Sequence, residues 1–257
     1  LVSCDDHLLT NNHCTWDDND FDTQGELNRM EWQFMYQDAT CGGGSPAFED
    51  SFMGGTWLEN NANLEYTLVQ APGAENPAAT YGWLLLDIRT AIIGEQMYVL
   101  GHPAGRPKEI AYFSTESGDT GGVCRVLSNS ESPCIGGSAQ EVGYTCDTEG
   151  GNSGSPVLAY SNHKVIALHH CGGCNNKGVA ISNVYNSIQQ SAPVLPSCTT
   201  NDALGTVELD GAAYTCSDTI SIEVNDGSLV GAGTVGVIIW STLEPTPENR
   251  TLTETPA

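Results

Sequence analysis

The stretch that decides the fold is Gly150-Gly151-Asn152-Ser153-Gly154-Ser155-Pro156-Val157. A serine lies among glycines at the entry to an apolar run, which is how a hydroxyl nucleophile is held on a tight turn. Glycine permits positive φ angles and lets backbone N–H groups point at one spot, where they can hold an oxyanion. We predict Ser153 as a nucleophile, with the N–H groups of Gly151 and Ser153 as the oxyanion hole. The alternative is a Gly/Ser-rich surface loop.

A histidine upstream supports the first interpretation. It lies in Leu8-Leu9-Thr10-Asn11-Asn12-His13-Cys14, after a short apolar run. Of the six histidines, only His13 follows an apolar run (Leu8-Leu9) and then precedes a plausible acid and Ser153. We predict that His13 is the general base, which takes the serine proton and returns it to the leaving group.

The third member of this arrangement is a glutamate. No Asp occurs between Asp50 and Asp87, and Glu65 stands directly before the apolar run Tyr66–Val69. A His–Glu pair can fix the tautomer and stabilise imidazolium as a His–Asp pair does, and such triads occur in other hydrolase folds. We predict Glu65 for this role, with Glu59 in reserve. The alternative is that Glu65 is a solvated residue at a strand start and that the site is impaired.

Composition excludes several partner classes. The 257 residues carry 8 Lys plus Arg against 32 Asp plus Glu, a formal net charge of −24, so nucleic acid and anionic membranes are unsuitable partners. No apolar run approaches the ~20 residues of a membrane span. The ten cysteines favour disulfides and an oxidising compartment. The chain begins at Leu1-Val2, and we expect an export signal and the first strands to precede it.

Many short apolar runs, 29 Gly and 12 Pro predict an all-β protein. We expect a catalytic domain over residues 1–194, a linker over 195–204 and a second β domain over 205–257. One helix is predicted at Asn183–Gln190, where Val184 and Ile188 share a face. The predicted strands of the first domain are Tyr66–Val69, Trp83–Ile88, Met97–Leu100, Pro156–Ala159, Val165–His169 and Gly178–Ile181.

The chain resembles the chymotrypsin-like serine peptidases of the bacterial glutamyl and lysyl endopeptidase type. The resemblance covers His13 to about Gln190 and rests on four stretches in family order: the His13 segment, Leu64–Leu68, Gly101–Lys108 and Asp147–Val157. It implies a double β-barrel, here with an N-terminally truncated first barrel and a short C-terminal helix. The tail resembles the start of an immunoglobulin-like repeat, and its roughly fifty residues predict a partial sandwich because a full one needs ~100.

Two departures from related enzymes matter. Glu65 stands where the family usually has Asp. Asn152 stands where animal trypsin-like enzymes carry an Asp that ion-pairs with the newly cut N-terminus. Because Asn cannot form that ion pair, we expect activation of any precursor to use another device.

Two residues compete to set the preference for the residue before the scissile bond, P1. Asp147 lies six positions before Ser153, where a trypsin-like pocket carries its acid, and would imply Lys or Arg. His169 resembles the histidine with which glutamyl endopeptidases bind the substrate carboxylate, and His170 and Gly172 would line the same pocket. We expect an acidic P1 residue, with Lys or Arg as the alternative; the heavy negative charge opposes acidic substrates at low salt.

The cysteines near these residues are disulfide candidates. Cys14 follows His13, and a disulfide there, with Cys41 as the preferred partner, would anchor the histidine loop. Cys171 and Cys174 beside the two histidines also match a zinc ligand set, but a secreted chain favours disulfides. We expect no metal and no cofactor.

The sequence thus predicts a secreted, monomeric bacterial serine endopeptidase acting on peptide or protein substrates through an acyl-enzyme. The alternative is a catalytically impaired pseudopeptidase that serves as a binding or adhesion module.

Overall fold

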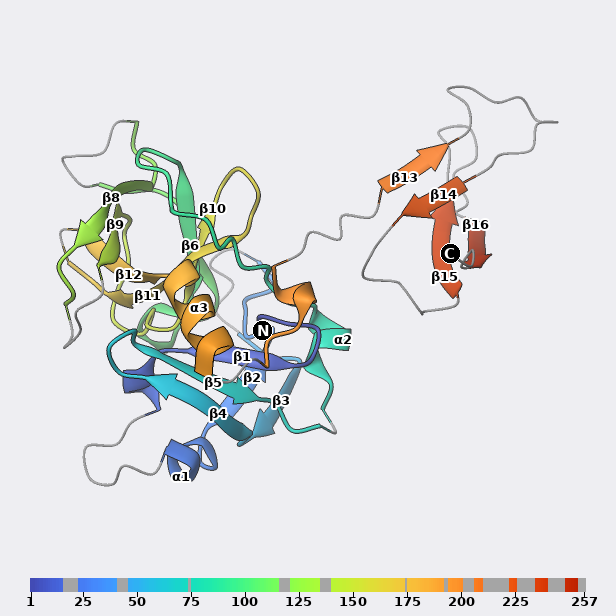
Figure 1. The fold of residues 1–257 in the computed structure, drawn as a ribbon, viewed down its shortest axis with the longest axis horizontal. Coiled ribbons are helices and arrows are strands. Elements are labelled where there is room, and N and C mark those ends of the chain that lie inside the picture. Colours follow the sequence, from blue (N-terminus) through green and yellow to red (C-terminus); the bar gives the residue numbers. More distant parts are fainter. Residues whose placement is uncertain are drawn as a thin grey trace. The chain divides into compact units, whose positions relative to one another are not determined.

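The computed structural model divides the chain into two compact units, Leu1–Thr200 and Asn201–Ala257 (Figure 1). In the first unit it describes residues 1–15, 23–40, 46–73, 75–115, 121–134, 140–173, 175–191 and 194–200. In the second it describes four strands, β13 (Thr206–Leu209), β14 (Ile222–Asn225), β15 (Thr234–Ile239) and β16 (Glu248–Thr253). The predicted all-β character is confirmed.

The first half of unit 1 holds two small antiparallel sheets. One has the strand order β1-β5-β4 and the other pairs β2 with β3. Strand β5 is central because Tyr66, Thr67, Leu68 and Val69 are all buried, and β-branched and aromatic residues favour such positions. The elements are β1 (His7–Thr10), η1 (Asn12–Cys14), α1 (Thr23–Leu27), β2 (Glu31–Phe34), β3 (Asp50–Met53), β4 (Thr56–Asn61), β5 (Tyr66–Gln70) and α2 (Pro77–Tyr81).

The second half forms one sheet of seven strands in the order β7-β6-β10-β11-β12-β9-β8. Its centre is β11, whose first six residues are buried between neighbours on both sides. The elements are β6 (Met97–Gly101), η2 (Pro103–Gly105), β7 (Glu109–Ala111), β8 (Arg125–Glu131), β9 (Glu141–Thr145), β10 (Pro156–Ala159), β11 (Val165–Cys171) and β12 (Asn176–Ala180).

One of the three hydrophobic clusters among the described residues joins the two halves. Helix α3 (Ile181–Ser191) directs Val184 and Ile188 into a buried cluster that also holds Leu68 from β5 and Leu168 from β11. The helix predicted at Asn183–Gln190 is thus confirmed, and η3 (Ser197–Thr199) follows it.

Five of the six predicted strands are present, with ends that match the prediction or differ from it by at most two residues. The sixth prediction, Trp83–Ile88, is wrong. Only Leu86 forms an isolated bridge, to Val165, and the backbone of this segment also bonds to Leu1 and Thr199. Its hydrogen bonds are divided among three distant segments, so no strand ladder forms.

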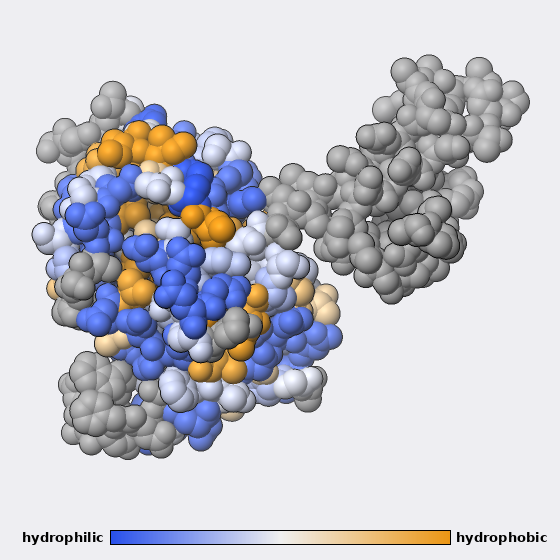
Figure 2. Space-filling view, viewed as in Figure 1, coloured by the Kyte–Doolittle hydropathy of each residue, from blue (hydrophilic) through white to orange (hydrophobic). Residues whose placement is uncertain are grey.

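Among the described residues, three disulfides join Cys4 to Cys198, Cys124 to Cys146 and Cys134 to Cys171. None of the described helices has the length and apolar character needed to cross a membrane. The visible face of unit 1 is mostly hydrophilic with scattered hydrophobic patches (Figure 2).

Candidate active site

The turn that carries Ser153 connects β9 to β10. We call residues 149–155 the Ser153 turn. Backbone bonds from Asn152 N to Glu149 O (3.2 Å) and from Ser155 N to Asn152 O (3.0 Å) close it, and Gly154 N bonds to His169 O of β11 (2.9 Å). The turn is therefore fixed at both of its ends, and Ser153 lies between them.

The backbone of this turn can receive an oxyanion. Gly151 has φ +100°, and a Cβ at this position would lie 2.7 Å from Ala104 N, so residue 151 must be glycine. Within the described part of the chain, the N–H groups of Gly151 and Ser153 have no hydrogen-bond acceptor. Both of the predicted oxyanion donors are thus available.

His13 and Glu65 are in direct contact. Glu65 Oε2 lies 2.7 Å from His13 Nδ1, and the Glu65 side chain is 5% exposed against 33% for His13. Glu65 adopts φ +47° at the entry to β5, and its carbonyl accepts a hydrogen bond from Asn11 Nδ2 (2.9 Å). A buried carboxylate therefore contacts one ring nitrogen of a partly exposed histidine.

The surroundings of His13 stabilise its charged form. A hydrogen bond with the Cys14 side chain, and then the contact with Glu65, raise the pKa of His13 to about 10, against the opposing effect of burial. Cys14 is exposed and forms no disulfide with any cysteine that the structure describes. Its expected partner, Cys41, lies outside the described residues, and this pairing stays a prediction.

The Ser153 turn packs against the segment that carries His13. A Cβ on Gly154 would lie 2.6 Å from Thr10 Oγ1 and 3.5 Å from Asn11 N. Among the hydrogen bonds of the described residues, none joins the Ser153 hydroxyl to His13. Catalytic hydrogen bonds are often long in free enzymes and shorten with substrate, so the assignment depends on proximity rather than on a formed bond.

The reserve acid is engaged elsewhere. Glu59 on β4 accepts hydrogen bonds from Tyr66 Oη (3.0 Å) and from Ser191 Oγ of α3. It makes no described contact with His13.

The predicted substrate-binding histidines are both buried on β11. Tyr144 Oη lies 2.5 Å from His169 Nδ1, and burial, with a contribution from His170, lowers the pKa of His169 to about 4. His170 Nε2 lies 3.0 Å from Glu141 Oε1. His169 is therefore a neutral imidazole whose Nδ1 is bound and whose Nε2 has no partner among the described residues.

The other two predicted pocket residues are exposed. Asp147 accepts hydrogen bonds from the backbone and hydroxyl of Thr115. It lines a cavity of about 180 Å³ together with Phe113, Arg106 and Asn152. Gly172 follows β11 and has only Asn176 near its open side.

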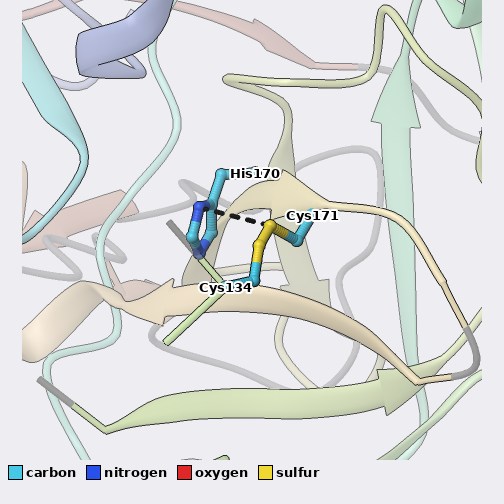
Figure 3. A group of neighbouring side chains, drawn as sticks. All are labelled: Cys134, His170 and Cys171. Atoms are coloured by element: carbon cyan, nitrogen blue, oxygen red, sulfur yellow. Dashed lines mark hydrogen bonds between the residues drawn. A yellow bond between two sulfur atoms is a disulfide. The ribbon is translucent and has the colours of Figure 1, made fainter. Parts of the chain in front are cut away.

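Cys171 is bonded to Cys134, and His170 Nδ1 lies 3.8 Å from Cys171 Sγ (Figure 3). The ligand atoms of these three residues all lie within 4.8 Å of one another. The two sulfur atoms are bonded to each other, however, and a disulfide sulfur is not the thiolate that zinc requires. Cys174 lies outside the described residues.

Sequence reasoning missed two contributors. Tyr144 lies in the run Glu141–Thr145, which is buried at every position but was not predicted as a strand. Arg106, in the stretch Gly101–Lys108, bonds to Glu149 of the Ser153 turn across 43 residues of sequence, a contact that no local pattern indicates.

Comparison with known proteins gives a consistent result. The family described as "Trypsin-like peptidase domain" matches residues 1–168. The chain is 37% identical over 195 residues to the "Secreted RxLR effector protein 73" of Plasmopara viticola, covering 74% of this chain but only 44% of that relative. The chain thus spans less than half the length of this curated relative.

Solved structures show the same fold at low identity. An HtrA-type protease, AlgW with a tripeptide, matches 76% of this chain and 54% of its own, with 10% identity and a TM-score of 0.52. The active form of the Rv3671c protease from M. tuberculosis matches 78% and 75%, with 15% identity and a TM-score of 0.50.

Proposed function

Since the chain belongs to the family of trypsin-like peptidases and has their all-β, chymotrypsin-like fold, we propose that it is a secreted serine endopeptidase. The observation that carries the proposal is the 2.7 Å contact between His13 Nδ1 and the buried Glu65 carboxylate. The segment of His13 packs against a glycine turn with two N–H groups that have no acceptor among the described residues.

The proposed reaction proceeds through an acyl-enzyme. Ser153 Oγ attacks the scissile carbonyl carbon while His13 Nε2 takes the hydroxyl proton, and the N–H groups of Gly151 and Ser153 stabilise the oxyanion. His13 gives the proton to the leaving amine. Water then attacks the ester with His13 again as base, which frees the acid product and restores the serine. Glu65 holds His13 in the correct tautomer throughout.

For specificity, we propose an acidic P1 residue bound by His169. Because the Tyr144 hydroxyl can donate to Nδ1, the neutral His169 ring would carry its proton on Nε2, where it can donate to a substrate carboxylate. Asp147 has a structural partner in Thr115, which supports a structural role for this carboxylate. Tyr144→Phe should therefore weaken discrimination in favour of acidic P1 residues, and Asp147→Ser should not.

Secretion is supported by three disulfides and by the relative that is named a secreted effector. That name speaks only for the relative. For this chain, secretion and a role outside the cell are part of the proposal.

The test is digestion of a denatured protein library followed by mass spectrometry of the new termini. We expect cleavage after Glu or Asp that disappears in Ser153→Ala. Cleavage after Lys or Arg would refute the His169 assignment but not the peptidase, whereas cleavage that persists in Ser153→Ala would refute the nucleophile.

A further inference from the structure

The Ser153 turn is supported from outside by the loop that follows β6. We call residues 102–106, which include η2, the buttress loop. Ala104 N donates to Gly150 O (2.7 Å), and Gly151 packs against Ala104 N and His102 O so closely that a Cβ would not fit. Ala104 itself adopts φ +51°, an uncommon conformation for a residue with a side chain. The two loops are therefore shaped to fit each other.

The side chain of Arg106 adds ion pairs to the contact between the buttress loop and the Ser153 turn. Its guanidinium donates from Nη1 and Nη2 to both Glu149 carboxylate oxygens (3.1 and 2.9 Å) and from Nε to Glu109 of β7 (2.8 Å). Glu149 is the first residue of the Ser153 turn, and Glu109 is the first residue of a sheet strand. The arginine thus ties the turn to the seven-stranded sheet.

The ion pair between Arg106 and Glu149 matters because the Ser153 turn contains two consecutive glycines. Gly150 and Gly151 have more conformational freedom than other residues, and a turn that aims Gly151 N–H elsewhere has no oxyanion hole. The residue before the nucleophile, Asn152, is uncharged and cannot restrain the turn through an ion pair. Its side chain is instead packed over Gly101, where an added Cβ would lie 2.1 Å from Asn152 Oδ1.

We propose that Arg106 is a positioning residue for the oxyanion hole, which holds the Ser153 turn in its active conformation through Glu149. The inference rests on the proposed function, because the turn serves an oxyanion hole only if Ser153 is a nucleophile. The ion pairs are exposed, with Arg106 42% and Glu149 58% accessible, and single exposed pairs contribute little. Here one bidentate fork engages two carboxylates, the geometry in which exposed pairs do contribute.

The test compares Arg106→Ala with Arg89→Ala. Arg89 also bridges two carboxylates, Asp87 and Glu95, but its described contacts include no residue of the Ser153 turn. It is therefore a matched control for the loss of a bridging arginine. Active-site titration normalises all rates to the number of competent molecules.

We expect Arg106→Ala to lower kcat about fivefold with little change in KM, the factor that corresponds to the upper range of exposed pairs. Affinity for a peptide boronate, whose boronate oxygen occupies the oxyanion hole, should fall by the same factor. Arg106→Lys should recover part of the lost kcat, because lysine keeps the positive charge but cannot make the bidentate hydrogen bonds of the guanidinium group. The gap between wild type and Arg106→Ala should narrow in 1 M salt, where the screening length is ~3 Å.

Hydrogen exchange of the peptide spanning 149–155 gives a readout that does not need activity. Exchange should accelerate in Arg106→Ala and stay unchanged in Arg89→Ala. Equal exchange and equal kcat in wild type and Arg106→Ala would overturn the inference. Wild-type protein without Ser153-dependent turnover would refute the proposed function instead, and the exchange rates would still decide whether Arg106 holds the turn.

Discussion

Replacing Glu65 tests the least usual member of the proposed triad. Glu65→Gln keeps the size of the side chain but removes the charge that faces His13 Nδ1 at 2.7 Å. Glu65→Asp keeps the charge and shortens the side chain by one methylene, about 1.5 Å. Asp tolerates the left-handed backbone found at residue 65 better than most residues, so the backbone conformation should survive.

The expected losses of kcat follow from the distance between the Glu65 carboxylate and His13. At an effective dielectric constant of about 20, unit charges at 2.7 Å attract by ~6 kcal/mol, and at about 4.2 Å by ~4 kcal/mol. The difference of ~2 kcal/mol, applied to the imidazolium that forms in the transition state, lowers the maximal kcat of Glu65→Asp about 30-fold. Glu65→Gln should lose about 10⁴-fold, because its amide donates to Nδ1 and leaves the proton on the nitrogen that must act as base.

The assay is kcat and kcat/KM on a peptide substrate across pH, with Glu59→Gln as the matched control. Glu59 is another acid of the same small sheet, and it bonds to Tyr66 and Ser191 rather than to His13. Its replacement should lower the melting temperature but leave kcat within about twofold. Because Glu65 raises the pKa of His13, its removal should also move the acid limb of kcat/KM to lower pH. A Glu65→Gln protein that keeps more than about a tenth of wild-type kcat would refute the triad.

Three further predictions concern the turn, the histidine and the core. Gly151→Ala should lower kcat at least about a hundredfold, because the new Cβ would meet Ala104 and displace the oxyanion donor. In the control Gly150→Ala, the new Cβ would meet nothing within 4 Å, so kcat should stay within a few-fold of wild type. Equal losses of kcat in the two variants would contradict the packing of Gly151 against Ala104. Cys14→Ala should move the acid limb of kcat/KM to lower pH, since it removes the side-chain hydrogen bond that raises the pKa of His13, and an unmoved limb would refute that coupling. Ile188→Ala, fully buried on α3, should lower the free energy of unfolding by about 2–5 kcal/mol in a urea titration, and a loss under about 1 kcal/mol would contradict its place in the core.

Local sequence was sufficient for the parts of the site that depend on residue type and spacing. The glycines around Ser153 and the apolar run after Glu65 determine their own backbone geometry, so the turn and the start of β5 were predictable. Helix α3 was predictable for the same reason, because Val184 and Ile188 recur at helical spacing.

What could not be predicted depends on contacts between distant segments. The segment Trp83–Ile88 is apolar enough for a strand, but its backbone bonds are distributed among Leu1, Val165 and Thr199. The bond between Arg106 and Glu149 and the pairing of Tyr144 with His169 arise only after the sheet has formed. The pairing of Cys134 with Cys171 likewise requires β11 and β8 to be brought together through β12 and β9, which spacing alone does not give.

The most direct test of the account is labelling of the folded protein with a fluorophosphonate probe, compared with Ser153→Ala at matched secondary-structure content. The account predicts labelling of the wild type at Ser153 and none of the variant, because only a serine activated by His13 attacks the probe. The rate should rise with pH as His13, whose pKa is raised to about 10, loses its proton. Folded wild-type protein that remains unlabelled across this pH range would contradict the account.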